Sequence, residues 1–119
     1  MNKLTVFLTL TITLIAAGHG FCATPDLAAA KANYQLFCVK CHGPNGQGNG
    51  PAAATLKTKP RNYTDCKKMS TITDTTLFNA IKNGGASVGL SADMPAWKQG
   101  FDDDDIHNLV AFVRSFCKK

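Results

Sequence analysis

The sequence predicts an all-α fold with three main helices and long loops. Two observations support this class: three segments carry apolar residues at helical spacing, and no segment of useful length alternates apolar and polar residues as a strand would. The length of 119 residues predicts one domain, and a hydrophobic content of 45% is too high for disorder. The composition also excludes a coiled coil, a collagen-like chain, a polytopic membrane protein and a multidomain enzyme.

The first 22 residues are predicted to be a signal peptide. Lys3 precedes an uncharged run over residues 4–17, and small residues follow at Gly18 and Gly20, which is the order of a secretory signal. An uncleaved anchor is the alternative, but the run is shorter than the roughly 20 residues of a membrane span. Cleavage after Gly20 or after Cys22 fits, and the second leaves an even number of cysteines. We therefore expect a domain over residues 23–119 in the periplasm or another extracytoplasmic compartment.

The three helices have recognisable ends. The first is predicted over residues 26–37, after Thr24-Pro25. The second covers 73–83, with Thr73 as its cap and Gly84 after its end. The third covers 103–117 and begins in a run of acids at the positive end of its dipole. The first and last helices are expected to pack together through Tyr34 and Phe37 on one and Leu109, Phe112 and Val113 on the other.

Long loops separate these helices. Residues 43–51 are rich in Gly and Pro, residues 52–56 suit a single helical turn, residues 57–69 are polar and irregular, and residues 86–100 form a loop that carries Met94-Pro95. Structureless connections of this length are uncommon in compact domains. We therefore expect something other than protein to fill the centre of the fold.

The segment Cys38-Val39-Lys40-Cys41-His42 is a Cys-x-x-Cys-His motif, which in an exported protein is typical of c-type haem attachment. Two thiols at this spacing can each bond one vinyl group of a porphyrin, and the next residue can place its imidazole on the iron. A redox dithiol is an alternative, but it is expected at a strand–helix junction, whereas this motif ends a helix. A zinc site would need two further ligands, and only His107 and two isolated cysteines remain.

At this point the chain resembles a family, the small mono-haem class I cytochromes c of the bacterial periplasmic type. The resemblance is carried by Cys38-Val-Lys-Cys-His42-Gly43, Gly46-Gln-Gly48-Asn-Gly50-Pro51, Met94-Pro-Ala-Trp97 and Leu109-Val-Ala-Phe112-Val-Arg. It implies a cytochrome c-like fold wrapped around one covalently attached haem c. It also implies an electron carrier rather than an enzyme, shuttling single electrons between redox partner proteins.

The resemblance assigns further residues to the haem. It places the distal iron ligand on Met94. From the residues themselves, Met69 in the polar run 65–71 is the alternative ligand, and His107, off the apolar stripe of the last helix, is expected at the surface. The resemblance also gives the carbonyl of Pro51 as the acceptor of the His42 ring proton, a bond that would fix the tautomer of the ligand.

Three more residues are candidates to contact the haem. Arg61 and Tyr63 offer donors for the haem propionates, because buried carboxylates need them, although both side chains also suit an ordinary surface. Trp97 is expected to pack on the haem or to bond a propionate.

Cys66 and Cys117 remain after the haem cysteines are assigned. In an oxidising compartment a disulfide between them is the favoured prediction, and two unrelated thiols are the alternative. The bond would close a loop of about 50 residues and contribute about 4 kcal/mol in a chain-entropy treatment. Its expected role is structural.

The formal net charge of +5 and the uneven placement of charges bear on partners. Acids cluster at 102–105, whereas the bases are spread over Lys57, Lys59, Arg61, Lys67, Lys68, Lys118 and Lys119. We expect a monomer that docks on acidic patches of redox proteins, without nucleic acid and without stable membrane insertion after signal cleavage. The alternatives are a haem-bearing subunit or anchored domain of a larger respiratory oxidase or reductase, and a gas- or peroxide-binding protein with an open distal site.

Overall fold

The fold is helical, as the sequence predicts. A computed structural model of the protein describes residues 24–118, and the predicted signal peptide lies outside them. The elements are α1 (Leu27–Asn33), the π-helical η1 (Tyr34–Cys38), α2 (Val39–His42), the 3-10 turn η2 (Ala53–Thr55), α3 (Cys66–Met69), α4 (Asp74–Asn83), the 3-10 turn η3 (Gly85–Val88) and α5 (Asp103–Ser115). Within residues 24–118 there is no β-strand, and no helix is long and apolar enough to cross a membrane.

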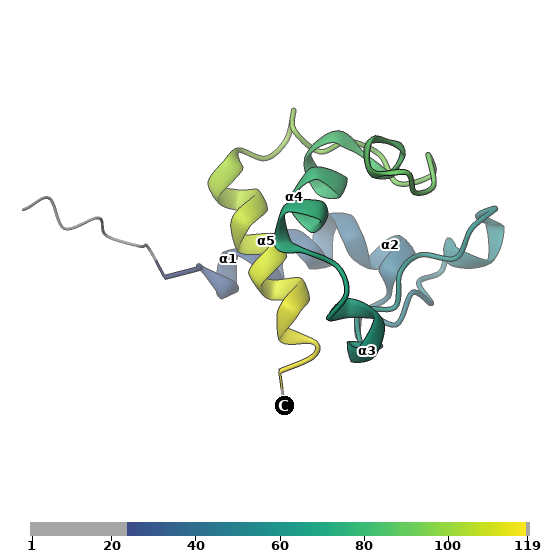
Figure 1. The fold of residues 1–119 in the computed structure, drawn as a ribbon, viewed down its shortest axis with the longest axis horizontal. Helices are drawn as coiled ribbons and strands as arrows, with labels where there is room; N and C mark the ends of the chain where they lie inside the picture. Colours follow the sequence, from purple (N-terminus) through teal and green to yellow (C-terminus); the bar gives the residue numbers. More distant parts are fainter. Residues whose placement is uncertain (1–23, 119) are drawn as a thin grey trace, which may run out of the picture.

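Helix α5 is the centre of the helical layer. Helices α1 and α4 both pack against it, and Figure 1 shows α1 crossing behind it while α4 lies beside it. Two loops, residues 43–60 and 84–96, extend away from these helices on the same side. The helices and the two loops together enclose the space in which the functional residues lie.

The ends of α4 and α5 follow the predicted signals. The Thr73 hydroxyl accepts a hydrogen bond from the backbone N–H of Thr76 at 3.1 Å, and Gly84 ends α4 with a φ of 86°. The Asp102 side chain accepts from the N–H of Asp105 at 2.8 Å as part of a capping box. Both helices therefore begin and end within two residues of the predicted positions.

The expectation of an irregular segment over residues 57–69 was wrong at its end. The last four residues form α3, because the Asp65 carboxylate accepts from the N–H of Lys68 at 3.2 Å and so caps a short turn. This turn buries Met69, which belongs to the core with Tyr34, Ile106 and Leu109.

The first helix is longer and less regular than predicted. Instead of ending at residue 37, it continues through η1 and α2 to His42. In η1 the N–H of Val39 donates to the carbonyl of Tyr34, five residues earlier, and this wider turn rotates the following side chains away from their regular positions. Tyr34 packs on Phe112 with ring centroids 5.2 Å apart, as expected. Phe37 is instead 45% exposed, and its aromatic neighbours are Trp97 and Phe101, which lie outside α5.

The segment around α3 is tied to the C-terminal end of α5. The sulfurs of Cys66 and Cys117 are bonded, with Cα atoms 5.4 Å apart. The Arg114 guanidinium donates to the carbonyls of Met69, at 2.6 Å, and Ile72, and it pairs with Asp74 at 2.7 Å. These contacts hold residues 66–74, which follow Tyr63 in the chain, against the C-terminal end of α5.

Candidate haem site

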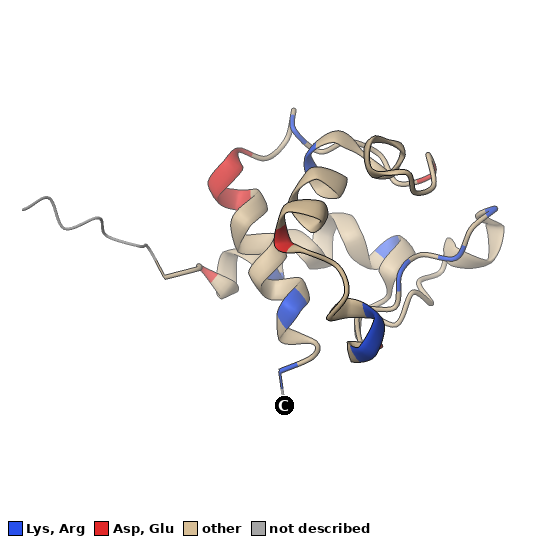
Figure 2. Ribbon diagram, viewed as in Figure 1, with Lys and Arg blue, Asp and Glu red and all other residues tan. Residues whose placement is uncertain are grey.

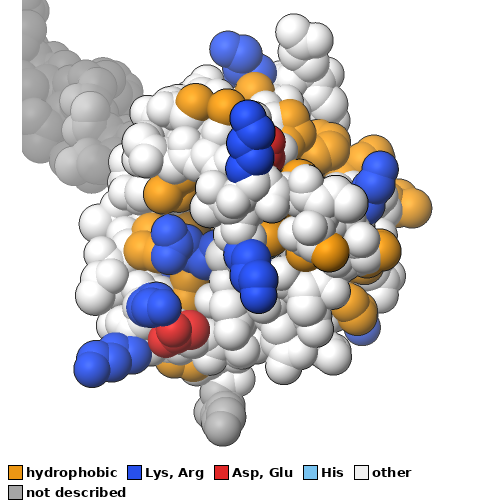
Figure 3. Space-filling view, turned by 90° about the vertical axis from the view of Figure 1, so that its right-hand side faces the viewer, with side chains coloured by type: hydrophobic (Ala, Val, Ile, Leu, Met, Phe, Trp, Pro, Cys, Tyr) orange, Lys and Arg blue, Asp and Glu red, His pale blue; other side chains and the backbone are white. Residues whose placement is uncertain are grey.

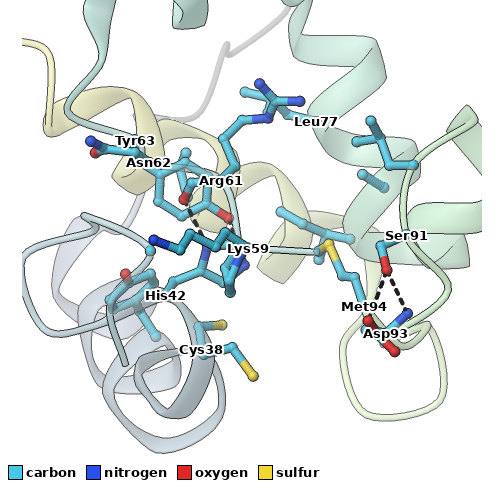
Figure 4. Close-up of a pocket in the computed structure, with 18 of the residues that line it drawn as sticks. Cys38, His42, Lys59, Arg61, Asn62, Tyr63, Leu77, Ser91, Asp93 and Met94 are labelled. Carbon is cyan, nitrogen blue, oxygen red and sulfur yellow. Dashed lines mark hydrogen bonds between the residues drawn. The ribbon is translucent and has the colours of Figure 1, made fainter. Parts of the chain in front are cut away.

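A single cavity of about 550 Å³ brings most of the predicted site residues together. Its volume lies in the range of about 300–1,000 Å³ that is usual for cofactor sites. The predicted residues that line it are Cys38, Cys41, His42, Arg61, Tyr63, Met94 and Trp97. Figure 4 shows His42 and Cys38 on one side of this cavity and Met94 on the loop across it.

His42 is presented to the cavity at the end of α2. Gly43 leaves the helix with a φ of 78°, and the N–H of Gly48 donates to the carbonyl of His42 at 2.8 Å, which fixes the backbone there. Nδ1 of the imidazole lies 3.2 Å from the carbonyl oxygen of Arg61, and Nε2 lies 3.2 Å from the hydroxyl of Tyr63. The Tyr63 ring stacks on the imidazole with centroids 4.6 Å apart.

These two contacts define the tautomer of His42. A carbonyl oxygen only accepts, so Nδ1 carries the ring proton and Nε2 presents a lone pair to the Tyr63 hydroxyl. Burial lowers the pKa of His42 and favours the neutral ring, while burial raises the pKa of Tyr63 well above its usual range and keeps its hydroxyl protonated. A neutral imidazole with a lone pair on Nε2 is the form that binds a metal.

The prediction that Pro51 accepts the His42 ring proton is wrong in this structure. Pro51 is exposed and does not line the cavity. Around it, the N–H groups of Gly50 and Ala52 donate to the carbonyls of Cys41 and Lys40, so this turn closes the end of the helix instead of reaching the ring. The carbonyl of Arg61 takes the place that the family resemblance implied for Pro51.

Cys38 and Cys41 are partly buried and are not bonded to each other. Burial and the neighbouring Cys41 raise the pKa of Cys38 to about 11. A reactive dithiol has the opposite property, since its nucleophilic cysteine has a lowered pKa. The motif also ends a helix with no strand among residues 24–118, so the redox-dithiol alternative has no support in the described chain.

Met94 is held by the end of α4. Its carbonyl accepts from the N–H of Gly85 at 3.0 Å, and the N–H of Trp97 donates to the carbonyl of Ile81 at 3.0 Å. The alternative ligand Met69 is 2% exposed in the core and does not line the cavity. His107 is exposed and lies against the Phe78 ring with centroids 4.5 Å apart.

The chemistry of this donor set fits a covalently attached haem. Two thiols, a neutral imidazole and a thioether face one cavity whose walls are largely apolar, and two further side chains, those of Arg61 and Tyr63, supply polar donors. Cys38 and Cys41 would hold the porphyrin, and His42 would bind its iron through Nε2 in place of the contact with Tyr63.

Comparison with known proteins identifies the family. A family model described as cytochrome c oxidase, cbb3-type, subunit III matches residues 25–113. The chain belongs to this family of c-type cytochrome domains. The predicted resemblance to class I cytochromes c is thereby confirmed, and a cytochrome c domain takes part in electron transfer by means of haem c.

Individual relatives of this cytochrome c domain differ in length. The present chain is 33% identical over 90 residues to the cbb3-type cytochrome c oxidase subunit FixP of Bradyrhizobium sp. (strain ORS 278). The match covers 76% of this chain but 27% of FixP. The chain is 30% identical over 88 residues to cytochrome c-554(548) of Halomonas halodenitrificans (strain ATCC 12084 / NCIMB 8669), covering 74% of this chain and 94% of that protein. The solved structure of the KustC0563 c-type cytochrome matches with a TM-score of 0.60 at 22% identity, over 73% of this chain and 95% of that one, and supports the fold.

Sequence reasoning missed two contributors to the cytochrome c site. The Arg61 carbonyl on His42 had no sequence signal, because any residue offers the same backbone oxygen. Phe37, which lines the cavity, was assigned to the core by its helical spacing. The position of Phe37 directly before the cysteine motif could have indicated that its side chain lies at the haem site.

Proposed function

We propose that this chain is a soluble, exported carrier of single electrons, with one haem c bound to Cys38 and Cys41 and ligated by His42 and Met94. The observation that carries the proposal is the placement of His42 and Met94 on opposite sides of one cavity, with both cysteines beside the histidine. Two protein ligands leave no iron position for a substrate, which favours electron transfer over catalysis.

Each protein group has a defined part in this function. The haem iron supplies the one-electron redox couple when it is bound. Nδ1–H of His42 donates to the Arg61 carbonyl, which keeps the ring oriented and makes it a stronger ligand. The thioether of Met94 favours the ferrous iron and raises the potential. Phe37 and Trp97, 5.6 Å apart between ring centroids, form part of the apolar wall against which the porphyrin would pack.

The main alternative is a haem-bearing subunit of a larger oxidase. The name of FixP, a cbb3-type oxidase subunit, favours it. The match to cytochrome c-554(548) over nearly its whole length supports a small carrier. An export signal over residues 1–22 with cleavage after Cys22 is part of the carrier proposal.

The surface around the cavity suits an acidic redox partner. Lys59, Arg61 and Lys68 line the cavity. Figure 3, which looks onto the side of the molecule where the two loops extend, shows basic side chains spread among apolar ones. Four of the eight acids lie elsewhere, at the start of α5 (Figure 2), whereas Asp65 and Asp93 line the cavity beside these bases. This arrangement favours an encounter in which the cavity side faces the partner.

One set of measurements on the purified protein tests the proposal. A reduced-minus-oxidised spectrum and a redox titration report the haem type and potential, and the oxidised protein should show the red-region band of iron–sulfur ligation. The intact mass should equal residues 23–119 plus one haem. A missing iron–sulfur band would support the open distal site, and a retained N-terminus would support the anchored subunit.

A further inference from the structure

We propose that the Cys66–Cys117 disulfide is a positioning element for His42, and that opening it weakens the hydrogen bond from His42 Nδ1 to the Arg61 carbonyl. The inference rests on the proposed ligation of haem iron by His42. It gives this disulfide a role in the redox site beyond its contribution to stability.

The segment 61–66 contacts the imidazole of His42 in three ways. The carbonyl of Arg61 receives the Nδ1 proton at 3.2 Å, the Tyr63 hydroxyl lies 3.2 Å from Nε2, and the Tyr63 ring stacks on the imidazole. The Nδ1 contact remains available when Nε2 binds iron, since it uses the other nitrogen. The position of segment 61–66 therefore determines how strongly Nδ1 is bonded.

Few contacts fix this segment from its N-terminal side. In the described chain, none of the backbone N–H groups from Lys57 to Asn62 donates to another backbone carbonyl. The next backbone anchor is the N–H of Tyr63, which donates to the carbonyl of Gly46 at 2.6 Å. Segment 61–66 is therefore held by this one bond to the Gly-rich loop and by the contacts at its C-terminal end.

The disulfide holds that end. Cys66 is the last residue of the segment, and the sulfur of Cys117 lies 3.1 Å from the carbonyl oxygen of Tyr63. Phe116, next to Cys117, stacks on the Tyr63 ring with centroids 6.1 Å apart and an interplanar angle of 18°. A continuous series of contacts thus runs from the disulfide through Phe116 and Tyr63 to the imidazole of His42.

The disulfide is also open to small thiols, because Cys66 is exposed. A dithiol reductant attacks one sulfur, forms a mixed disulfide and then closes into its own cyclic disulfide. The dithiol loses two electrons and two protons, and Cys66 and Cys117 become two thiols. Wild-type protein can therefore be compared with and without the bond.

The test uses NMR on the ferrous holoprotein and follows hydrogen exchange of the His42 Nδ1–H. We expect exchange about five- to tenfold faster in the Cys66→Ser/Cys117→Ser variant, which corresponds to the loss of one ordinary hydrogen bond. Dithiothreitol should produce the same increase in the wild type and none in the variant. The midpoint potential of the variant should rise, because a less strongly bonded imidazole is a weaker donor to ferric iron.

Asp102→Ala is the control, because it removes the cap of α5 far from segment 61–66 and should change neither quantity. If the double variant does not yield holoprotein, the dithiothreitol comparison on the wild type decides. An unchanged exchange rate, or a potential that falls, overturns the inference. Failure of the proposed function is seen separately, as a wild-type protein without a haem c spectrum.

Discussion

At the scale of single residues, the sequence predicts the groups whose side-chain chemistry is distinctive. Cys38, Cys41 and His42 were identified from their spacing, and the structure places all three on one cavity. The partner of His42 Nδ1 was not predictable, because it is a backbone carbonyl supplied by Arg61 across 19 residues of chain. A wrong assignment to Pro51 was the result of relying on a resemblance where no side chain carries the signal.

Met94→Ala tests the distal ligand. We expect the haem to stay covalently attached, the potential to fall because the thioether is lost, and exogenous imidazole to bind at the vacated iron position. Absorption spectra, a redox titration and an imidazole titration measure the three effects. Met69→Leu is the matched control, since Met69 is buried in the core and the change conserves volume at a cost below about 1.5 kcal/mol.

A Met94→Ala protein with an unchanged spectrum and potential would count against Met94 as the ligand. If Met69→Leu instead opened the site, the ligand would have been assigned to the wrong methionine.

At the scale of elements, helices with clear caps were predictable and departures from regular periodicity were not. Thr73 and Gly84 define the ends of α4 in both the sequence and the structure, and α5 begins in the predicted acidic run, where Asp102 is the cap. The π-helical segment η1 breaks the 3.6-residue pattern, so the side chain of Phe37 could not be placed from its spacing. The wider turn moves Phe37 from the helix interface to the cavity wall.

The loop that carries Met94 depends on the small size of Gly85. A Cβ at this position would collide with the backbone carbonyl oxygen of Ser91 and lie 3.2 Å from the Cβ of Met94. Gly85→Ala should therefore displace the loop and weaken or abolish the iron–sulfur band while the haem stays attached. Gly100→Ala is the control, because its nearest atom beyond chain neighbours would be the Trp97 carbonyl oxygen at 3.8 Å. Equal spectra for the two variants would contradict this account of the loop.

Arg114 joins α5 to the chain between α3 and α4. Its guanidinium donates to two backbone carbonyls and to Asp74, and its side chain is 22% exposed. Arg114→Ala should lower the free energy of unfolding by about 2–4 kcal/mol, because it leaves carbonyls of Met69 and Ile72 without their charged donor. Denaturant titration of the holoprotein measures this loss.

Lys82→Ala provides the comparison for Arg114→Ala. Lys82 pairs with Asp103 at 2.7 Å, but the Asp103 side chain is 61% exposed. An exposed pair contributes no more than about 1 kcal/mol, so this variant should be much less destabilised. Similar losses for both variants would show that the backbone contacts of Arg114 contribute little.

At the scale of the whole molecule, the long loops were the most informative feature of the sequence. They predicted that the centre of the fold is not filled by protein alone, and the structure has a cavity of about 550 Å³ between the helices and the loops. Charge counts predicted a basic protein but not where its bases face. Only the folded chain brings Lys59, Arg61 and Lys68, which are separated in sequence, to the same cavity.

The last prediction concerns this basic side of the molecule. Lys57 and Lys59 lie on the exposed loop beside the cavity, so Lys57→Glu/Lys59→Glu reverses charge where the partner is proposed to dock. With an acidic electron-transfer protein as partner, the wild-type second-order rate should fall steeply as salt is added, because screening acts over about 10 Å at 0.1 M ionic strength. The variant should react about tenfold more slowly at low salt and depend less on salt.

Lys31→Glu/Lys98→Glu is the matched control, since it makes the same change in net charge at exposed positions that do not line the cavity. Stopped-flow rates at several ionic strengths compare the three proteins. If local docking matters, the control keeps most of the wild-type rate, because the charges near the contact surface contribute more than distant ones. Equal slowing in both variants would mean that only net charge steers the encounter, and a wild-type rate that does not change with salt would reject basic docking for that partner.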